Sequence, residues 1–494
     1  MRETFSRIYQ KGVNALWVAF ILLLPLTSSP QVAALAGGTM VAAPSGLIAV
    51  LLLLIWLLPL ILRNMPFQRH LLPLLLFIAS VFLSTIIGMW REIPPFKGIN
   101  PLRENIESIL TVFLGVSFYL AAYFWLREKN SKKDFKLVLR LITYGGIATI
   151  VKALAEVVIW RVYGTWPDWY RSAHNLIVSG TLFRDRVVAF TFEPSWLADQ
   201  LNLLFLPYWL ASALTRFSAF KRRLWKFQVE DICLVLGAAV LFFTLSRLGY
   251  ISFLLMIGVL ILRGTGWLTR RVQEWLTERN ARFKGEQAGK SLRAGLLAVV
   301  GLFYIGMFIA AAFVFSRLDH RSREIFNFTN FNMMKYAERL SFGARITYWW
   351  GGWNIFNDHP MLGVGLGNAG FYLPEALPAY AWRLIEIREL MFHTNYALNL
   401  KSLWVRLLAE TGIVGFAAFL SFVLMILFMA LSLKRREKRF AKFTGWMGLF
   451  GMAAFLVEQF SLDTFALPYF WVTFAFIAAV YEYYRRKKHT EEQV

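Results

Sequence analysis

Long apolar runs without a charge constrain this sequence more than any other feature. Three of them lie at 46–62, 71–90 and 294–315. A helix crosses the hydrocarbon core of a bilayer with about 20 apolar residues, so each run is close to the length of a membrane span. The composition agrees, because 57% of the residues are hydrophobic and only 17% are charged, which is too apolar for an ordinary soluble domain.

The whole chain, interpreted in this way, predicts an all-α, polytopic membrane protein with about twelve transmembrane helices. The predicted spans are 12–29, 44–62, 71–90, 106–126, 136–160, 188–214, 230–245, 248–263, 292–315, 403–433, 443–460 and 464–484. Turn residues within the loop 316–402 predict several short helices there. We therefore expect 1–315 to hold nine spans, 316–402 to form one large loop, and 403–494 to hold three spans and a tail.

The distribution of the net charge of +23 argues against a nucleic-acid partner. Most of the 53 Lys and Arg residues fall in alternate loops, including 127–140, 216–226 and 434–442. Short loops rich in Lys and Arg face the cytoplasm. Both termini are therefore predicted to be cytoplasmic and the loop 316–402 extracytoplasmic, and the expected surroundings of the protein are membrane lipid.

The stretch Gly365–Gly370 spells G-x-G-x-x-G, a pattern found in dinucleotide-binding folds. That interpretation requires a buried strand before the glycines, whereas Asn357–Pro360 is a turn sequence. Gly363, Gly365 and Gly367 are instead expected to take positive φ angles and to pack closely. The sequence has no D-x-D, no H-E-x-x-H and no Cys/His ligand set, so neither a metal nor a cofactor is predicted.

Several segments resemble the O-antigen ligase and O-antigen polymerase superfamily. They are "RITYWWGGWNIFNDHPMLGVGLGNAGF" at 345–371, "VRLLAETGIVGF" at 405–416, "FFTLSRLGYIS" at 242–252, and "FTFEPSWLADQ" at 190–200, which is similar to an element of the polysaccharide-polymerase branch. The resemblance implies a glycosyltransferase of the multi-spanning GT-C type in a bacterial inner membrane. It also implies a substrate glycan carried on undecaprenyl pyrophosphate.

Transfer from a lipid pyrophosphate needs groups that hold its charge, and arginine matches phosphate oxygens with a planar fork. Arg247 is the first candidate, because an Arg within an apolar run usually faces a cavity or a partner; the alternative is a side chain that reaches the headgroups. The resemblance assigns Arg345 to the family's loop arginine, whereas alone it would be a solvated helix charge. Arg317, Arg321 and Arg323 either hold lipid headgroups or the lipid diphosphate, or form a surface patch.

Two residues are candidates for the base that accepts the proton of the attacking hydroxyl. Glu193 precedes a proline, which predicts an extended or turn conformation at the edge of the sixth span; the alternative is a stabilising pair with Arg184 or Arg186. His393 has a suitable pKa range. By resemblance, however, the family's histidine position falls on Lys401, which we expect to contact phosphate.

Three functions remain open at this point. A polymerase would join lipid-linked repeat units, and the "EPS" element together with Lys401 favours it. A ligase would move a finished glycan to an acceptor such as a lipid A core. A transporter or flippase would move an anionic solute, but the sequence lacks the two related halves typical of transporters. Glu410 of "LAETG" is expected to cap a helix or pair within the bundle, and a chain-length regulator protein is a further partner to consider.

Overall fold

A computed structural model describes residues 2–35, 41–62, 68–221, 225–279, 343–394 and 396–492, with scattered helical positions between 294 and 309. The helices are α1 (Arg2–Leu22), α2 (Pro30–Leu35), α3 (Pro44–Leu52), η1 (Leu53–Leu57), α4 (Leu58–Leu62), η2 (Arg69–Leu71), α5 (Leu72–Met89), α6 (Pro101–Lys129), α7 (Lys132–Tyr163), α8 (Asp168–Ile177), α9 (Pro194–Gln200), η3 (Leu201–Phe205), α10 (Leu206–Thr215), α11 (Val229–Phe243), α12 (Arg247–Arg279), α16 (Gly343–Asp358), α17 (Ala369–Ala376), η6 (Ala379–Arg383), α18 (Ile385–His393), α19 (Leu403–Lys434), α20 (Arg439–Glu458) and α21 (Tyr469–Glu492). The described residues contain no strand, apart from an isolated bridge between Ser28 and Ala42. The predicted all-α class is confirmed for this part of the chain.

Six helical stretches are long and apolar enough to cross a membrane. They are Pro44–Leu62, Arg69–Met89, Pro101–Lys129, Lys132–Tyr163, Leu403–Lys434 and Arg439–Glu458. These stretches match the second to fifth, tenth and eleventh predicted spans. Five other predicted spans fall on α1, α9 to α10, α11, α12 and α21, which are not among the six, and 292–315 lies largely outside the described residues. The predicted number of about twelve therefore stays a prediction.

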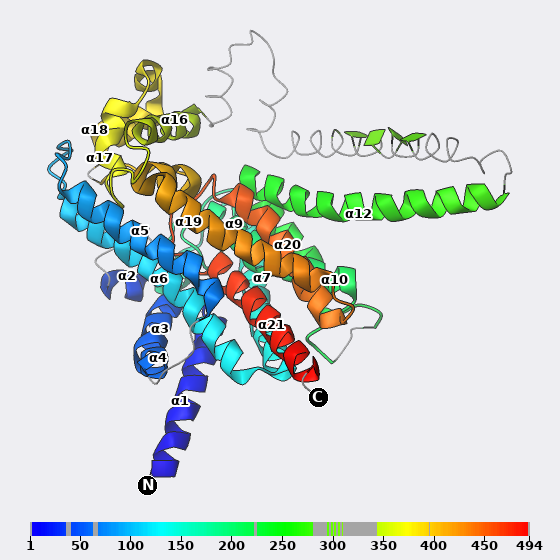
Figure 1. Ribbon diagram of the computed structural model, residues 1–494. Helices are drawn as coiled ribbons and strands as arrows, with labels where there is room; N and C mark the ends of the chain where they lie inside the picture. Colours follow the sequence, from blue (N-terminus) through cyan, green and yellow to red (C-terminus); the bar gives the residue numbers. More distant parts are fainter. Residues whose placement is uncertain are drawn as a thin grey trace. The chain divides into compact units, whose positions relative to one another are not determined.

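The chain divides into two compact units. The first comprises Met1–Ser252, Tyr348–Leu377 and Asn395–Val494, and it contains a helical bundle. In this bundle α19 packs against α5 and α20, α21 packs against α6, and α10 packs against α11 and α20 (Figure 1). The second unit comprises Phe253–Thr347 and Pro378–Thr394, where η6 contacts α18.

Aromatic side chains fill the centre of the bundle in the first unit. Phe419 and Phe422 of α19 are fully buried, and their ring centroids lie 6.4 and 6.1 Å from that of Trp471 of α21. Gly115 of α6 lies against the indole of Trp471, where a larger side chain would overlap the ring. Small residues of this kind let membrane helices approach closely, which strengthens their van der Waals packing.

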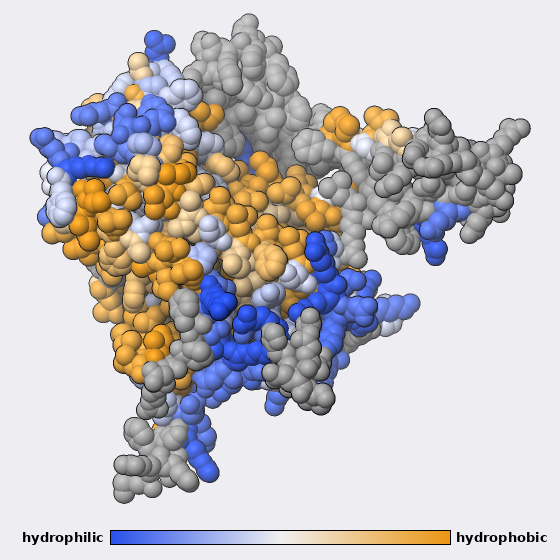
Figure 2. Space-filling model, viewed as in Figure 1, coloured by the Kyte–Doolittle hydropathy of each residue, from blue (hydrophilic) through white to orange (hydrophobic). Residues whose placement is uncertain are grey.

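The outward faces of the bundle are apolar. On α5, Leu75, Leu76, Phe82 and Leu83 are each exposed, whereas Phe77 on the opposite face is buried. Figure 2 shows apolar side chains over the middle of the bundle and hydrophilic side chains gathered where α21 ends. A large exposed apolar surface is unfavourable in water, and it fits the hydrocarbon of a bilayer.

The long helices run between two ends of the bundle that differ in character. The end of α20 and the start of α19 lie at what we call the turn end, which also carries the glycine turn 359–368. The opposite end carries Lys132 of α7, Lys434 of α19, Arg439 of α20 and Arg485 of α21, and we call it the basic end. The positive-inside rule predicts that the basic end faces the cytoplasm.

Candidate functional site

Helix α19 is interrupted at Gly412, close to the turn end. Gly412 has φ 61° and ψ −167°, a combination that is strained for residues other than glycine. The interruption leaves backbone N–H and C=O groups around it without their helical partners. Because Glu410, Thr411 and Gly412 are buried, these groups need other hydrogen bonds.

The glycine turn supplies those hydrogen bonds. Gly365 N donates to the Glu410 carbonyl at 3.0 Å, and Ile413 N donates to the Pro360 carbonyl at 2.8 Å. From α5, the hydroxyl of Ser84 donates to the same Glu410 carbonyl at 2.5 Å. The turn therefore satisfies the backbone groups that the interruption of α19 leaves without helical partners. This gives a physical reason for the presence of both motifs, "HPMLGVGLG" and "LAETG", in one chain.

Three glycines allow the turn to fit against its neighbours. Gly363, Gly365 and Gly367 have φ angles of 65°, 96° and 91°, the positive values expected from the sequence. A Cβ atom on Gly363 would lie 2.6 Å from the Ala409 carbonyl oxygen, and one on Gly367 would lie 2.6 Å from the Glu104 carbonyl oxygen. The glycines thus join α5, α6 and α19, and the residues before them form a helix and a turn instead of a strand.

Arg406, on the short first part of α19, donates hydrogen bonds to three neighbours inside the bundle. Its Nε donates to the Glu410 carboxylate at 2.8 Å, Nη1 donates to the Asp463 carbonyl at 2.7 Å, and Nη2 donates to the Ser108 hydroxyl at 2.9 Å. The side chains of Arg406 and Glu410 are only 13% and 5% exposed. Arg406 therefore holds α19 to α6 and to the loop before α21.

Arg406 and Asp463 were not among the candidates from the sequence. The signal for Arg406 was present, because an Arg and a Glu four residues apart within an apolar span form a neutral pair. No local pattern marks Asp463, which lies between α20 and α21. Its carboxylate accepts a hydrogen bond from Lys401 N at 3.1 Å.

Ser246 and Arg247 lie at the break between α11 and α12. Helix α11 ends at Phe243, Leu245 has φ 49°, and α12 begins at Arg247. The Ser246 hydroxyl accepts a hydrogen bond from Gly249 N at 3.3 Å, which caps the first turn of α12. This break falls between the predicted spans 230–245 and 248–263, and Arg247 is half-buried at the helix start.

The starts of α12 and α19 lie at the same end of the bundle. Asn202 of η3 donates to the Gly249 carbonyl at 2.8 Å and to the Glu458 carboxylate at 2.7 Å. Gln459, the next residue along the chain, accepts a hydrogen bond from the Ser402 hydroxyl at 3.1 Å. The end of α20 therefore connects both helix starts. Asn202 belongs to a π-helical turn, a rare form that is frequent at functional sites.

Glu193 lies at the start of α9, at the same turn end. Its φ of −144° and ψ of 161° are extended, which confirms the prediction made from the following proline. Its carboxylate accepts a hydrogen bond from the Ser195 hydroxyl. The alternative partner Arg186 donates instead to the Thr244 carbonyl at 2.8 Å. Within the described residues no ion pair joins Glu193 to Arg184 or Arg186.

The loop between α8 and α9 is anchored by Glu156 of α7. This carboxylate accepts hydrogen bonds from Val188 N at 2.8 Å and Ala189 N at 3.2 Å, and it pairs with Lys152 at 2.7 Å. The Lys152 ammonium is also 3.1 Å from Nδ1 of His174. Burial and the nearby Lys152 charge lower the pKa of His174, so at neutral pH His174 supports the loop as an uncharged ring.

The remaining candidates are not among the described residues of the first unit. Arg345, half-buried in the first turn of α16, and His393, exposed at the end of α18, belong to the second unit. Arg317, Arg321 and Arg323 lie outside the described residues. Among the residues that the structure describes, no group of three or more His, Cys, Asp and Glu side chains could hold a metal ion.

These features define a multi-pass, all-α membrane protein whose glycine turn and interrupted helix organise one end of a bundle. Residues 232–420 match the family model described as O-Antigen ligase, which is consistent with the O-antigen ligase and O-antigen polymerase superfamily. The resemblance seen in the sequence is thus confirmed, and the family indicates a ligase-like or polymerase-like membrane enzyme with a lipid-linked glycan substrate. The match includes Arg247, the glycine turn and Glu410, whereas Glu193 precedes it. No curated protein matches the chain.

Proposed function

We propose that this protein polymerises oligosaccharide repeat units linked to undecaprenyl pyrophosphate, at the turn end of the bundle on the extracytoplasmic face. The observation that carries the proposal is that the end of α20 connects to the start of α12, which bears Arg247, and to Ser402, the residue after Lys401 and before α19. Two cationic side chains at one end of the bundle suit a diphosphate. The family match supports a lipid-linked glycan as the substrate.

In the proposed reaction, a sugar hydroxyl of one lipid-linked glycan attacks C1 of the sugar that is joined to the pyrophosphate of another. The new C1–O bond forms as the bond from C1 to the pyrophosphate oxygen breaks, and the pyrophosphate leaves with the electron pair. Arg247 and Lys401 balance the charge that develops on this leaving group. Glu193 accepts the proton of the attacking hydroxyl.

Other candidates have subordinate roles in this proposal. Arg345, Arg317 and Arg321 are further groups for the pyrophosphate, and His393 is the alternative base. Glu410 and the glycine turn form the framework, because the Glu410 carboxylate accepts a hydrogen bond from Arg406 and the backbone groups around Gly412 bond to the turn.

A ligase is the second candidate function, because the matching family model is described as O-Antigen ligase. Both reactions use the same donor and differ only in the acceptor. Lys401 stands nine residues before Glu410, where the ligases of the family are expected to place a histidine. This substitution and the "EPS" element favour the polymerase.

An assay with purified protein in detergent and an undecaprenyl-pyrophosphate oligosaccharide separates these functions. A ladder of lengthened glycans is the expected result for a polymerase. Transfer only after addition of a lipid A core acceptor would identify a ligase. If neither product forms and the lipid-linked glycan instead crosses vesicle membranes, the protein is a transporter and the proposal is wrong.

Arg247→Lys tests the assignment of the pyrophosphate site. Lysine keeps the charge but loses the planar fork, and a charge-assisted hydrogen bond contributes about 1.5–3 kcal/mol. We expect the rate of glycan lengthening to fall roughly 10- to 100-fold. The matched control is Arg103→Lys, at an exposed Arg of the same end whose side chain is 72% exposed, and it should keep the wild-type rate. Wild-type turnover of Arg247→Lys would remove Arg247 from the mechanism.

A further inference from the structure

A cavity of about 560 Å³ lies at the basic end of the bundle, away from the proposed glycan site. It is lined by η2 and the residue before it, the end of α6, the second half of α19 and the end of α21. No step of the proposed reaction uses these residues. The proposed reaction therefore gives no role to this cavity.

Positive charge predominates in this cavity. Four guanidinium groups line it, from Arg69, Arg127, Arg485 and Arg486, and Glu482 is the one acidic side chain among the lining residues. Glu482 already pairs with the Nε atoms of Arg485 and Arg486, at 3.0 and 3.1 Å. One carboxylate balances only one of four positive charges, so the cavity favours an anion.

Two buried nitrogen atoms next to the guanidinium groups also point to a ligand. Nε of Arg127 and Nε2 of His70 have no hydrogen-bond partner among the residues that the structure describes. The Arg127 nitrogen always carries a hydrogen, and the His70 nitrogen carries one in one of its tautomers. A buried donor without an acceptor is unfavourable, and an anionic oxygen in the cavity would satisfy these donors.

The apolar side of the cavity indicates what kind of anion fits. Phe428 of α19 lines the cavity and is 58% exposed, and its ring centroid lies 6.5 Å from that of Tyr481. Leu424, one turn earlier on α19, is also exposed. An exposed apolar strip beside a basic cavity suits a molecule with an anionic headgroup and hydrocarbon chains.

We propose that this cavity binds an anionic phospholipid of the surrounding membrane. The phosphate oxygens accept hydrogen bonds from Arg127 and Arg69, and the acyl chains lie along Phe428 and Leu424. Basic pockets between membrane helices on the cytoplasmic side are suited to anionic headgroups, and the positive-inside rule predicts that this end is cytoplasmic.

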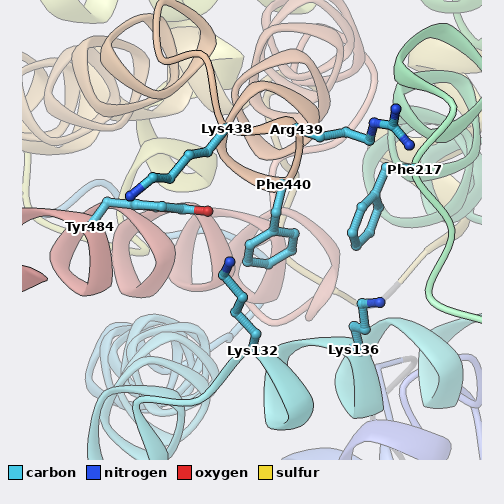
Figure 3. Close-up of a pocket in the computed structure, with 7 residues that line it drawn as sticks. All are labelled: Lys132, Lys136, Phe217, Lys438, Arg439, Phe440 and Tyr484. Atoms are coloured by element: carbon cyan, nitrogen blue, oxygen red, sulfur yellow. The ribbon is translucent and has the colours of Figure 1, made fainter.

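A second cavity at the basic end, of about 370 Å³, provides a matched control. Figure 3 shows Lys132 and Lys136 on one side of it and Lys438 and Arg439 on the other, with Phe217 and Phe440 between them. Its aromatic residues Phe217, Phe440 and Tyr484 are buried. This cavity therefore has the positive charge of the first one, but its aromatic rings offer no exposed strip to acyl chains.

The test measures binding of fluorescent phosphatidylglycerol to the full-length protein in neutral detergent micelles, with phosphatidylcholine and glycerol phosphate as comparison probes. In the double variant Arg69→Gln/Arg127→Gln, affinity for phosphatidylglycerol should fall roughly 30-fold, as expected for the loss of two basic residues at a membrane surface. The double variant Lys132→Gln/Lys438→Gln removes the same charge at the same end and should bind like the wild type.

Three results would overturn the proposal. They are equal losses in the two double variants, equal binding of the two phospholipids, and binding of glycerol phosphate as tight as that of the lipid. A second measurement uses the wild type and so does not depend on the folding of any variant. Phosphatidylglycerol with a photoreactive acyl chain should crosslink to peptides containing Leu424 or Phe428, and crosslinks confined to other helices would contradict the assignment.

Discussion

The charges of Arg406 and Glu410 compensate each other inside the bundle. Their side chains are 13% and 5% exposed and 2.8 Å apart. Removal of one member of a buried pair leaves the other charge without balance, which typically costs about 3–5 kcal/mol, whereas removal of both is often tolerated. The free energy of unfolding of the protein is therefore expected to depend on the balance between the two charges and not on either residue alone.

This expectation is tested with three variants: Arg406→Met, Glu410→Met and the double variant. Each single variant should lower the thermal unfolding temperature in detergent strongly, and the double variant should recover most of the loss. Glycan lengthening provides the second readout. A double variant that is as stable as the wild type but inactive would show that the pair acts on the substrate, contrary to its assignment to the framework.

At the scale of elements, the interruption of α19 is the feature on which the turn end depends. Gly412 is in a conformation that costs other residues on the order of 1–3 kcal/mol, and a Cβ atom there would overlap the Met361 carbonyl. The glycine turn donates and accepts the hydrogen bonds that a continuous helix would make by itself. The interrupted helix and the glycine turn are therefore expected to form, and to be lost, together.

Gly412→Ala should consequently lower the unfolding temperature and reduce glycan lengthening together. The control is Gly258→Ala on α12, where a Cβ atom would meet nothing within 4 Å, and alanine favours helix over glycine by about 1 kcal/mol. That control should be as stable as the wild type or slightly more stable. If Gly412→Ala matches it, α19 tolerates a continuous helix and the turn is not needed to complete it.

At the scale of the whole molecule, the two proposals require that the turn end, with the glycan site, faces outward and that the basic end, with the lipid cavity, faces the cytoplasm. The chain has one cysteine, Cys233, and it is buried, so labelling of the wild type by a membrane-impermeant maleimide should be low. Glu92 at the turn end and Lys442 at the basic end are both exposed.

Two variants, each with one added cysteine at one of these positions, test the orientation in spheroplasts. Glu92→Cys should be labelled from outside, and Lys442→Cys should be labelled only after the membrane is permeabilised. The reverse pattern would place the glycan site in the cytoplasm. Labelling of both from outside would mean that the long helices between them do not cross the membrane.

The sequence by itself determined the class of the protein, because hydrophobic runs, charge alternation and prolines act locally. The apolar runs predicted the all-α fold, the proline after Glu193 predicted its extended backbone, and the boundary between the predicted spans 230–245 and 248–263 fell at the break near Ser246. Only the tertiary structure decided the partners of Arg406, the insertion of the glycine turn into α19, and the buried donors of His70 and Arg127. These depend on residues that are close in space and tens to hundreds of positions apart in the chain, and no local pattern encodes such a contact.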